Sequence, residues 1–171
     1  LMNAGTELQQ LAACFVLPIG DSLESIFTAV KRTALIHQSG GGTGFSFSKL
    51  RPAGDVVKET GGVASGPVSF MKVFDAATEQ IKQGGRRRGA NMAVLDASHP
   101  DIEAFVTVKS EADTLRNFNL SVATDAAFWV AHGAGEPYDL VNPRTGEVVR
   151  RGSPDGLLDL IAEMAWETGD P

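Results

Sequence analysis

The sequence predicts an α/β fold, in which helices alternate with the strands of a sheet. Apolar residues recur at helical spacing over 23–37 and again over 68–81. Short segments of β type stand between and after these helices, at 45–48, 90–95 and 117–122. The chain has 171 residues, of which 43% are hydrophobic and 21% charged, so it can bury a real core. Repeated strand–helix alternation favours an α/β layer or barrel.

Capping and turn residues indicate where the elements begin and end. Asp21-Ser22-Leu23-Glu24 has the spacing of a helix start, and Ser153-Pro154-Asp155 predicts the start of a last helix that runs to 166. Glycines at 40–44 and 84–89 interrupt the pattern. The other expected elements are a long loop over 51–67, a helix beginning near Pro100, a helix from Asp125 to His132, and a hairpin that pairs 138–140 with 147–150.

Charge and cysteine content limit the partners and the compartment. The formal net charge of −6 argues against nucleic acid as a partner. No apolar run reaches the roughly 18 residues of a membrane span, and no signal peptide is visible. A single cysteine cannot form an internal disulfide, which predicts a reducing, cytoplasmic setting or a partner cysteine elsewhere. Because the chain starts at Leu1 and ends directly after a helical pattern, we expect an internal piece of a longer protein.

Two segments in the first quarter of the chain could carry chemistry or could simply shape the backbone. Cys14 lies in the apolar segment 11–18, where a lone cysteine is either a buried space-filling residue or a redox thiol with a distant partner. The glycines of 40–44 form either a tight turn or a backbone cradle for phosphate or sugar. They lack the Gly-Lys-Ser/Thr ending of a Walker loop.

The most unusual stretch is 82–91, where three consecutive arginines lie between glycines. It is either a solvated basic turn, or a nucleic-acid patch, or a loop that grips phosphates and base edges. No aromatic platform for bases lies near these arginines, which weakens the nucleic-acid alternative. The three histidines have no metal-ligand spacing, and the acidic residues show no obvious catalytic pairing.

Several segments together resemble class II ribonucleotide reductase, and their order and spacing make the resemblance specific. The segments are Asn3-Ala4-Gly5-Thr6, Leu11 to Pro18, His37 to Phe47, Arg51-Pro52-Ala53-Gly54-Asp55, Ala64 to Met71, Lys82 to Met92 and His99-Pro100-Asp101-Ile102. The resemblance is clear from Leu1 to about Thr124, and it returns in the helix over 153–166 and the residues that follow it.

This resemblance implies roughly the first half of a ten-stranded α/β barrel, as one fragment (1–171) of a catalytic domain. In the family a cysteine thiyl radical, made with adenosylcobalamin in class II, removes the 3′ hydrogen of a ribonucleotide. Two further cysteines supply the reducing electrons and become a disulfide, which a dithiol such as thioredoxin reduces. The resemblance makes Cys14 the first of that pair and puts Ala13, Cys14 and Gly42 at the substrate.

The resemblance also implies a site for a deoxynucleotide or ATP effector that selects the substrate base. Asp21, Arg51 and Lys58 correspond to effector-binding positions of the helix start and the first loop. Lys58 stands where the family often has arginine, and a point charge loses the bidentate geometry. Lys82, Gln83 and Arg87 correspond to the second loop, and a homodimer would form through helices 22–38 and 66–83.

The chain has no Asn-Pro-Cys-Gly-Glu segment, which in this family carries the radical cysteine. We therefore expect the isolated chain to be inactive as an enzyme, although the resemblance implies that its longer parent is a reductase. The alternative for the isolated piece is a nucleotide-binding regulatory module without catalysis.

Overall fold

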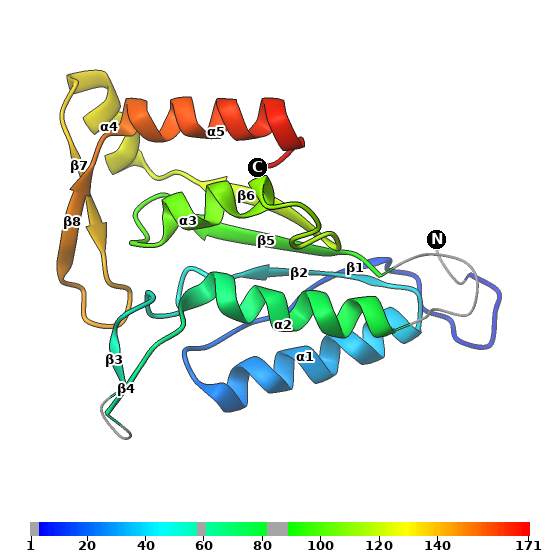
Figure 1. Ribbon diagram of the computed structural model, residues 1–171. Coiled ribbons are helices and arrows are strands. Elements are labelled where there is room, and N and C mark those ends of the chain that lie inside the picture. Colours follow the sequence, from blue (N-terminus) through cyan, green and yellow to red (C-terminus); the bar gives the residue numbers. More distant parts are fainter. Residues whose placement is uncertain (1–3, 58–60, 82–88) are drawn as a thin grey trace.

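A computed structural model describes residues 4–57, 61–81 and 89–171 of the chain (Figure 1). The elements in chain order are β1 (Cys14–Val16), α1 (Leu23–Gln38), β2 (Gly42–Ser46), β3 (Val56–Val57), β4 (Gly62–Val63), α2 (Gly66–Gln80), β5 (Asn91–Asp96), α3 (Ile102–Thr107), the 3-10 helix η1 (Val108–Ser110), β6 (Phe118–Ala123), α4 (Ala126–Ala134), β7 (Tyr138–Val141), β8 (Val148–Gly152) and α5 (Pro154–Thr168). The predicted α/β class is confirmed.

A parallel sheet of four strands, in the order β1-β2-β5-β6, forms the centre of the structure. The order follows the chain, so each connection through α1, α2 and α3 steps to the next strand in the same direction. Right-handed connections of this kind place all three helices on one face of the sheet. Figure 1 shows α1 and α2 lying side by side along it.

The two faces of the sheet differ in burial. In β5 the buried residues Ala93 and Leu95 alternate with Met92, which is 43% exposed. The strand register places the following residues on the same face as Met92: Cys14, Val16, Gly42 and Gly44. We call these five residues the open face, because Val16 and Met92 are exposed there and Cys14 is also exposed.

Aromatic side chains fill the space between the sheet and its helices. The rings of Phe45 and Phe74 lie 4.8 Å apart, and Phe47 meets Phe74 edge-on at 5.8 Å. All three side chains are fully buried. Removing one such ring typically costs about 3–5 kcal/mol. This cluster joins β2 to α2 and so fixes the position of the site-bearing strand.

Two antiparallel hairpins lie at the end of the sheet where β2 and β5 finish (Figure 1). The pair β3–β4 follows β2, and the pair β7–β8 follows α4. Asp55, just before β3, accepts hydrogen bonds from Arg144 and from Asn142, both in the turn between β7 and β8. The start of the β3–β4 hairpin is therefore fastened to the turn of the β7–β8 hairpin.

Several predicted boundaries need correction. The strand expected at 45–48 lies at Gly42–Ser46, because Gly42 and Thr43 pair with β1 and Thr43 also pairs with β5. The expected loop over 51–67 contains β3 and β4, and the segment 11–18 contains the strand β1. The predicted hairpin at 138–150 is confirmed. Within the described ranges no helix is long and apolar enough to cross a membrane.

Candidate functional site

Cys14 and Gly42 lie side by side at the start of β1 and β2. They are paired in the parallel register, and the amide of Gly42 donates to the carbonyl of Ala13 at 2.7 Å. The prediction that Ala13, Cys14 and Gly42 form one site is consistent with this arrangement. Cys14 is exposed within this chain, so none of the described residues buries it as the space-filling alternative expects.

Gly42 presents bare backbone on the open face. A Cβ atom at this position would lie 3.3 Å from the carbonyl oxygen of Ala90 and 3.8 Å from that of Ala13. The first distance is tight, so the two neighbouring strands leave little room for a side chain here. A ligand beside the thiol of Cys14 would therefore meet main-chain atoms at Gly42.

A buried chain of polar side chains lies beneath this site, on the helix-covered face of the sheet. His37 Nε2 is 3.1 Å from the hydroxyl of Thr43, which donates to Oδ1 of Asn91 at 2.7 Å. The amide of Asn91 donates to Thr78 at 2.8 Å, and Thr78 donates to the carbonyl of Phe74. These bonds join α1, β2, β5 and α2 directly behind Gly42. The spacing of these residues along the sequence gives no sign of this network.

Burial lowers the pKa of His37 below its ordinary value of 6.5, and the backbone of Ala90 opposes that shift only in part. The ring is fully buried, and Nδ1 makes no hydrogen bond of good geometry within the described residues. Gly89 lies directly against it, since a Cβ at that position would stand 2.8 Å from Nδ1. His37 is thus a neutral hydrogen-bonding member of the core.

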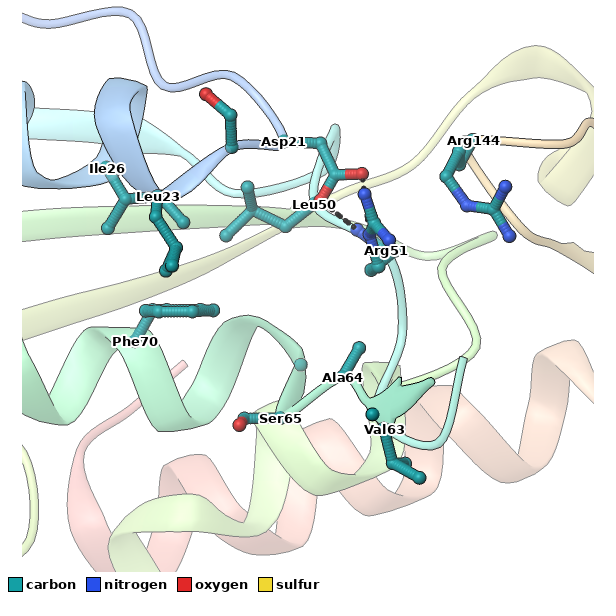
Figure 2. A pocket seen from close by; sticks show the side chains of 13 residues that line it. Asp21, Leu23, Ile26, Leu50, Arg51, Val63, Ala64, Ser65, Phe70 and Arg144 are labelled. Carbon is teal, nitrogen blue, oxygen red and sulfur yellow. Dashed lines mark hydrogen bonds and ion pairs between the residues drawn. The ribbon is translucent and has the colours of Figure 1, made fainter. Parts of the chain in front are cut away.

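A separate cavity of about 640 Å³ lies between the N-terminal ends of α1 and α2 (Figure 2). It is lined by Asp21, Ser22, Leu23, Ile26, Leu50, Arg51, Gly62, Val63, Ala64, Ser65, Gly66, Phe70 and Arg144. Figure 2 shows apolar side chains, Leu23, Ile26 and Phe70, at one end and the two arginines at the other. A ligand with an apolar ring and an anionic group matches this division.

Asp21 and Arg51, predicted from distant parts of the sequence to share a site, do meet in this cavity. Arg51 Nε donates to Asp21 Oδ2 at 2.8 Å, and the amide of Arg51 donates to Oδ1 at 3.2 Å. Ser22 caps α1 by accepting from the amide of Ser25, which leaves Asp21 free to hold Arg51. The other predicted effector positions, Lys58, Lys82, Gln83 and Arg87, lie outside the described residues.

Arg144 is a cavity residue that the sequence does not reveal. Its Nε and Nη2 donate to Asp55 at 3.0 and 2.9 Å. The Arg144 guanidinium holds the pKa of Asp55 well below its usual range, and Asp55 in turn raises the pKa of Arg144. The pair therefore stays ionised at neutral pH. Arg144 and Asp55 are 89 residues apart, so only their contact in space connects Arg144 with this cavity.

The cavity suits a phosphate ester better than a metal ion. Arginine groups donate to phosphate oxygens in a fixed planar geometry. No group of three histidine, cysteine or acidic side chains within the described ranges could hold a metal. The open face offers a thiol beside bare backbone, and the cavity offers two guanidinium groups beside an apolar wall.

Comparison with known proteins assigns the family. The family model described as "Ribonucleotide reductase, barrel domain" matches residues 12–171. The chain belongs to the ribonucleotide reductase family. This agrees with the resemblance seen in the sequence.

Relatives within the ribonucleotide reductase family align with the whole chain. A protein of Thermoplasma acidophilum named vitamin B12-dependent ribonucleoside-diphosphate reductase is 58% identical over 172 residues, covering 100% of this chain and 22% of its own length. One of the same name from Mycobacterium tuberculosis H37Rv is 55% identical, with 24% of its length covered. A vitamin B12-dependent ribonucleotide reductase of Streptomyces avermitilis is 37% identical over 99% of the chain. The chain thus spans about a fifth to a quarter of the length of these relatives.

Proposed function

We propose that the protein carrying this chain is an adenosylcobalamin-dependent ribonucleotide reductase, which converts ribonucleoside diphosphates or triphosphates to deoxyribonucleotides. The observation that carries the proposal is the pairing of an exposed Cys14 with Gly42 on the open face of a ribonucleotide reductase barrel-domain chain. The names of the relatives support the dependence on vitamin B12 and the diphosphate substrate. The cytoplasm, where thiols stay reduced, is the proposed compartment.

In the proposed reaction Cys14 is one thiol of a reducing pair, and it loses one electron and one proton. The C2′–O bond of the ribose breaks, the hydroxyl leaves as water, and Cys14 joins a second cysteine of the parent protein in a disulfide. Two thiols thereby supply the two electrons and two protons that the reduction needs. A dithiol protein such as thioredoxin would return Cys14 to the thiol by thiol–disulfide exchange.

Adenosylcobalamin, when bound, supplies the radical that starts the reaction at a cysteine elsewhere in the parent protein. The described cavity has apolar side chains at one end and two carboxylate-paired arginines at the other, and its lining contains no histidine or cysteine. We therefore assign none of the described residues to the cofactor. The part of this chain is to hold the substrate at Ala13, Cys14 and Gly42 and to supply one reducing thiol.

We propose that the four parallel strands belong to the ten-stranded barrel of the family, in a single catalytic domain that includes all of 1–171. The open face supports this, because α1, α2 and α3 cover only the opposite face of the sheet. In a barrel that face would point inward, and Cys14 would then lie in the interior with the substrate.

The cavity between α1 and α2 is the proposed effector site for a deoxynucleotide or ATP. Asp21 and Arg51 form part of it, and Lys58, Lys82, Gln83 and Arg87 remain predicted members from the two flanking loops. Exposed apolar residues on α1, Leu23 and Phe27, support the proposed homodimer through the helices at 22–38 and 66–83.

For the 171 residues alone, nucleotide binding without catalysis is the favoured function. The cavity is built entirely from described residues of this chain. The family reaction needs three cysteines, and the sequence contains one. The isolated chain is therefore expected to bind nucleotide and to form no deoxynucleotide.

Replacing Cys14 by serine in the complete protein tests the catalytic proposal. A hydroxyl fills similar space but cannot form a disulfide, so sustained turnover should fall at least about 100-fold, the scale of losing an essential catalytic group. Substrate affinity should stay nearly unchanged. The measurement is steady-state deoxynucleotide formation with a dithiol reductant, beside equilibrium binding of the ribonucleotide.

Ser46→Ala, at the far end of the adjacent strand, is the matched control and should keep wild-type turnover. Wild-type turnover of Cys14→Ser would refute the redox role. Equal loss of activity and of substrate affinity would mean that Cys14 shapes the site and does not supply electrons.

A further inference from the structure

Arg144 reaches the effector cavity from a part of the chain remote from the other cationic residue. It lies in the turn between β7 and β8, whereas Arg51 follows β2. The turn is held in shape by its own side chain, since the amide of Arg144 donates to Oδ1 of Asn142 at 2.9 Å. The backbone that carries Arg144 is therefore fixed against the cavity wall before any ligand arrives.

The guanidinium of Arg144 is also fixed in orientation. Asp55 accepts hydrogen bonds from Nε and Nη2 of Arg144. Asp55 is itself held in place because it also accepts from the side chain of Asn142 and from the amide of Val56. The side chain of Arg144 is 27% exposed and that of Asp55 only 12%. A planar group held along one edge keeps its other edge, with Nη1, for another acceptor. Nη1 has no hydrogen-bond partner among the residues that the structure describes.

Arg51, on the neighbouring wall of the cavity, is likewise held by a carboxylate. Asp21 holds it through Nε, and its terminal nitrogens make no hydrogen bond within the described part of the chain. Figure 2 shows the two guanidinium groups at the same end of the cavity, away from Phe70. Each carboxylate is already satisfied by its arginine, so a ligand would meet two sets of N–H donors.

We propose that Arg144 binds the phosphate groups of the effector together with Arg51. This inference rests on the proposed effector site. The ligand class is a nucleoside polyphosphate, whose phosphate chain would lie between the two guanidinium groups. Its base and sugar would lie toward the apolar wall of Leu23, Ile26 and Phe70. The β7–β8 hairpin thus becomes part of the regulatory site.

Binding of dATP and of dAMP to the complete protein tests this assignment, with dissociation constants from isothermal titration. Arg144→Ala should weaken dATP by about 10-fold to 100-fold, the usual range for losing a charge-assisted hydrogen bond. It should weaken dAMP much less, because a monophosphate cannot span both arginines. The ratio of the two affinities should therefore collapse toward one.

Arg151→Ala is the matched control, since Arg151 lies on the same hairpin and pairs with Asp139 at 2.9 Å but does not line the cavity. It should leave both affinities unchanged. Asp55→Asn removes the carboxylate that anchors Arg144 but keeps the cation. Under the proposal, dATP binding should weaken in Asp55→Asn less than in Arg144→Ala, because the cation is still present to bind phosphate. If Asp55→Asn loses as much dATP affinity as Arg144→Ala, and loses dAMP affinity equally, Arg144 acts only by holding the hairpin in place, and the inference is overturned.

Arg51→Ala separates failure of the inference from failure of the effector site. Loss of dATP binding in Arg51→Ala with wild-type binding in Arg144→Ala overturns the role of Arg144 and leaves the effector site intact. No binding of dATP, dTTP or ATP by the wild-type protein overturns the effector site itself. An equal loss of dAMP and dATP in Arg144→Ala places the residue at the base or sugar, against the proposal.

Discussion

At the scale of single residues, the contact between Gly89 and His37 explains why position 89 is a glycine, which the neighbouring sequence does not. Gly89 closes the arginine-rich stretch, where glycine looks like a source of flexibility. In the structure it is buried against His37 and Thr78, and a Cβ would stand 2.8 Å from the imidazole. The sequence shows the glycine, but the steric reason for it is the side chain of His37, which comes from the distant helix α1.

The buried imidazole of His37 makes stability depend on pH. Burial lowers its pKa in the folded state below the value of 6.5 that it has when unfolded. As the pH falls through 6.5, the unfolded chain therefore gains a proton that the folded chain does not, and stability decreases. Above pH 6.5 the residue is neutral in both states and adds no pH dependence. The melting temperature of the complete protein should accordingly drop between pH 7 and pH 5.

His37→Gln should make that pH dependence shallower, because the amide can still bond with Thr43 but does not titrate. Its melting temperature at pH 8 should be lower than that of wild type, since an amide fills the site less well. His132→Gln, at an exposed histidine beside Asp155, is the control and should keep the contribution of His37. An unchanged slope in His37→Gln would show that other groups cause it.

At the scale of elements, the sequence predicts best the helices whose capping residues lie next to them in the chain. Ser22, Asp125 and Ser153 each accept a hydrogen bond from a first-turn amide of α1, α4 and α5, as the capping pattern indicates. The strand β1 has only three residues, and its bonds come from β2 alone. Gly42 and Gly44 lie in a strand because β1 pairs with both of them and β5 pairs with Gly44. Such pairing is not visible in local sequence.

Asn91 connects four of these elements and should be costly to replace. Its side chain accepts from Thr43 on β2 and donates to Thr78 on α2, with His37 of α1 one bond further along. Asn91→Ala leaves buried hydroxyl groups without their partner, which typically costs about 1–3 kcal/mol. The measurement is thermal unfolding of the complete protein, in which the variant should melt at a lower temperature.

Asn119→Ala provides the comparison for Asn91, because Asn119 is an exposed residue of the next strand. It should change the melting temperature little. Equal effects of the two substitutions would mean that the polar network adds nothing to stability. A kinetic consequence is also expected, since loosening β2 moves Gly42, and the KM for ribonucleotide should rise in Asn91→Ala more than kcat falls.

At the scale of the whole molecule, the strand order explains why one face of the sheet is open. Each connection moves one strand further in the same direction, so the helices gather on one side. Alternation in the predicted strands indicates which residues face the core, but the strand order is a long-range property that composition and spacing do not contain. The ten-stranded barrel therefore comes from the family resemblance, and only the parallel, one-sided sheet is visible in the structure.

The outer surface of α1 leads to a prediction about assembly. Leu23, Phe27 and Leu35 are exposed at helical spacing, with Lys31 between the last two, and Phe27 is 53% exposed. Apolar residues in such a row are typical of a helix that packs against a partner. If two copies meet there, Phe27→Glu in the complete protein places a charge in the contact. Loss of a central aromatic contact commonly costs about 2 kcal/mol or more, so the variant should be largely monomeric at concentrations where the wild type is a dimer.

Sedimentation equilibrium with and without dATP measures this effect directly. Leu23 also lines the effector cavity, so breaking the dimer should weaken dATP binding as well. Thr28→Glu adds the same charge at the next exposed position of α1, on the row that contains Glu24 and Arg32. It should remain dimeric, because that row is polar and lies about 100° around the helix. If Phe27→Glu stays dimeric, the partner surface is not α1, and the exposed apolar row must be covered by another part of the complete protein.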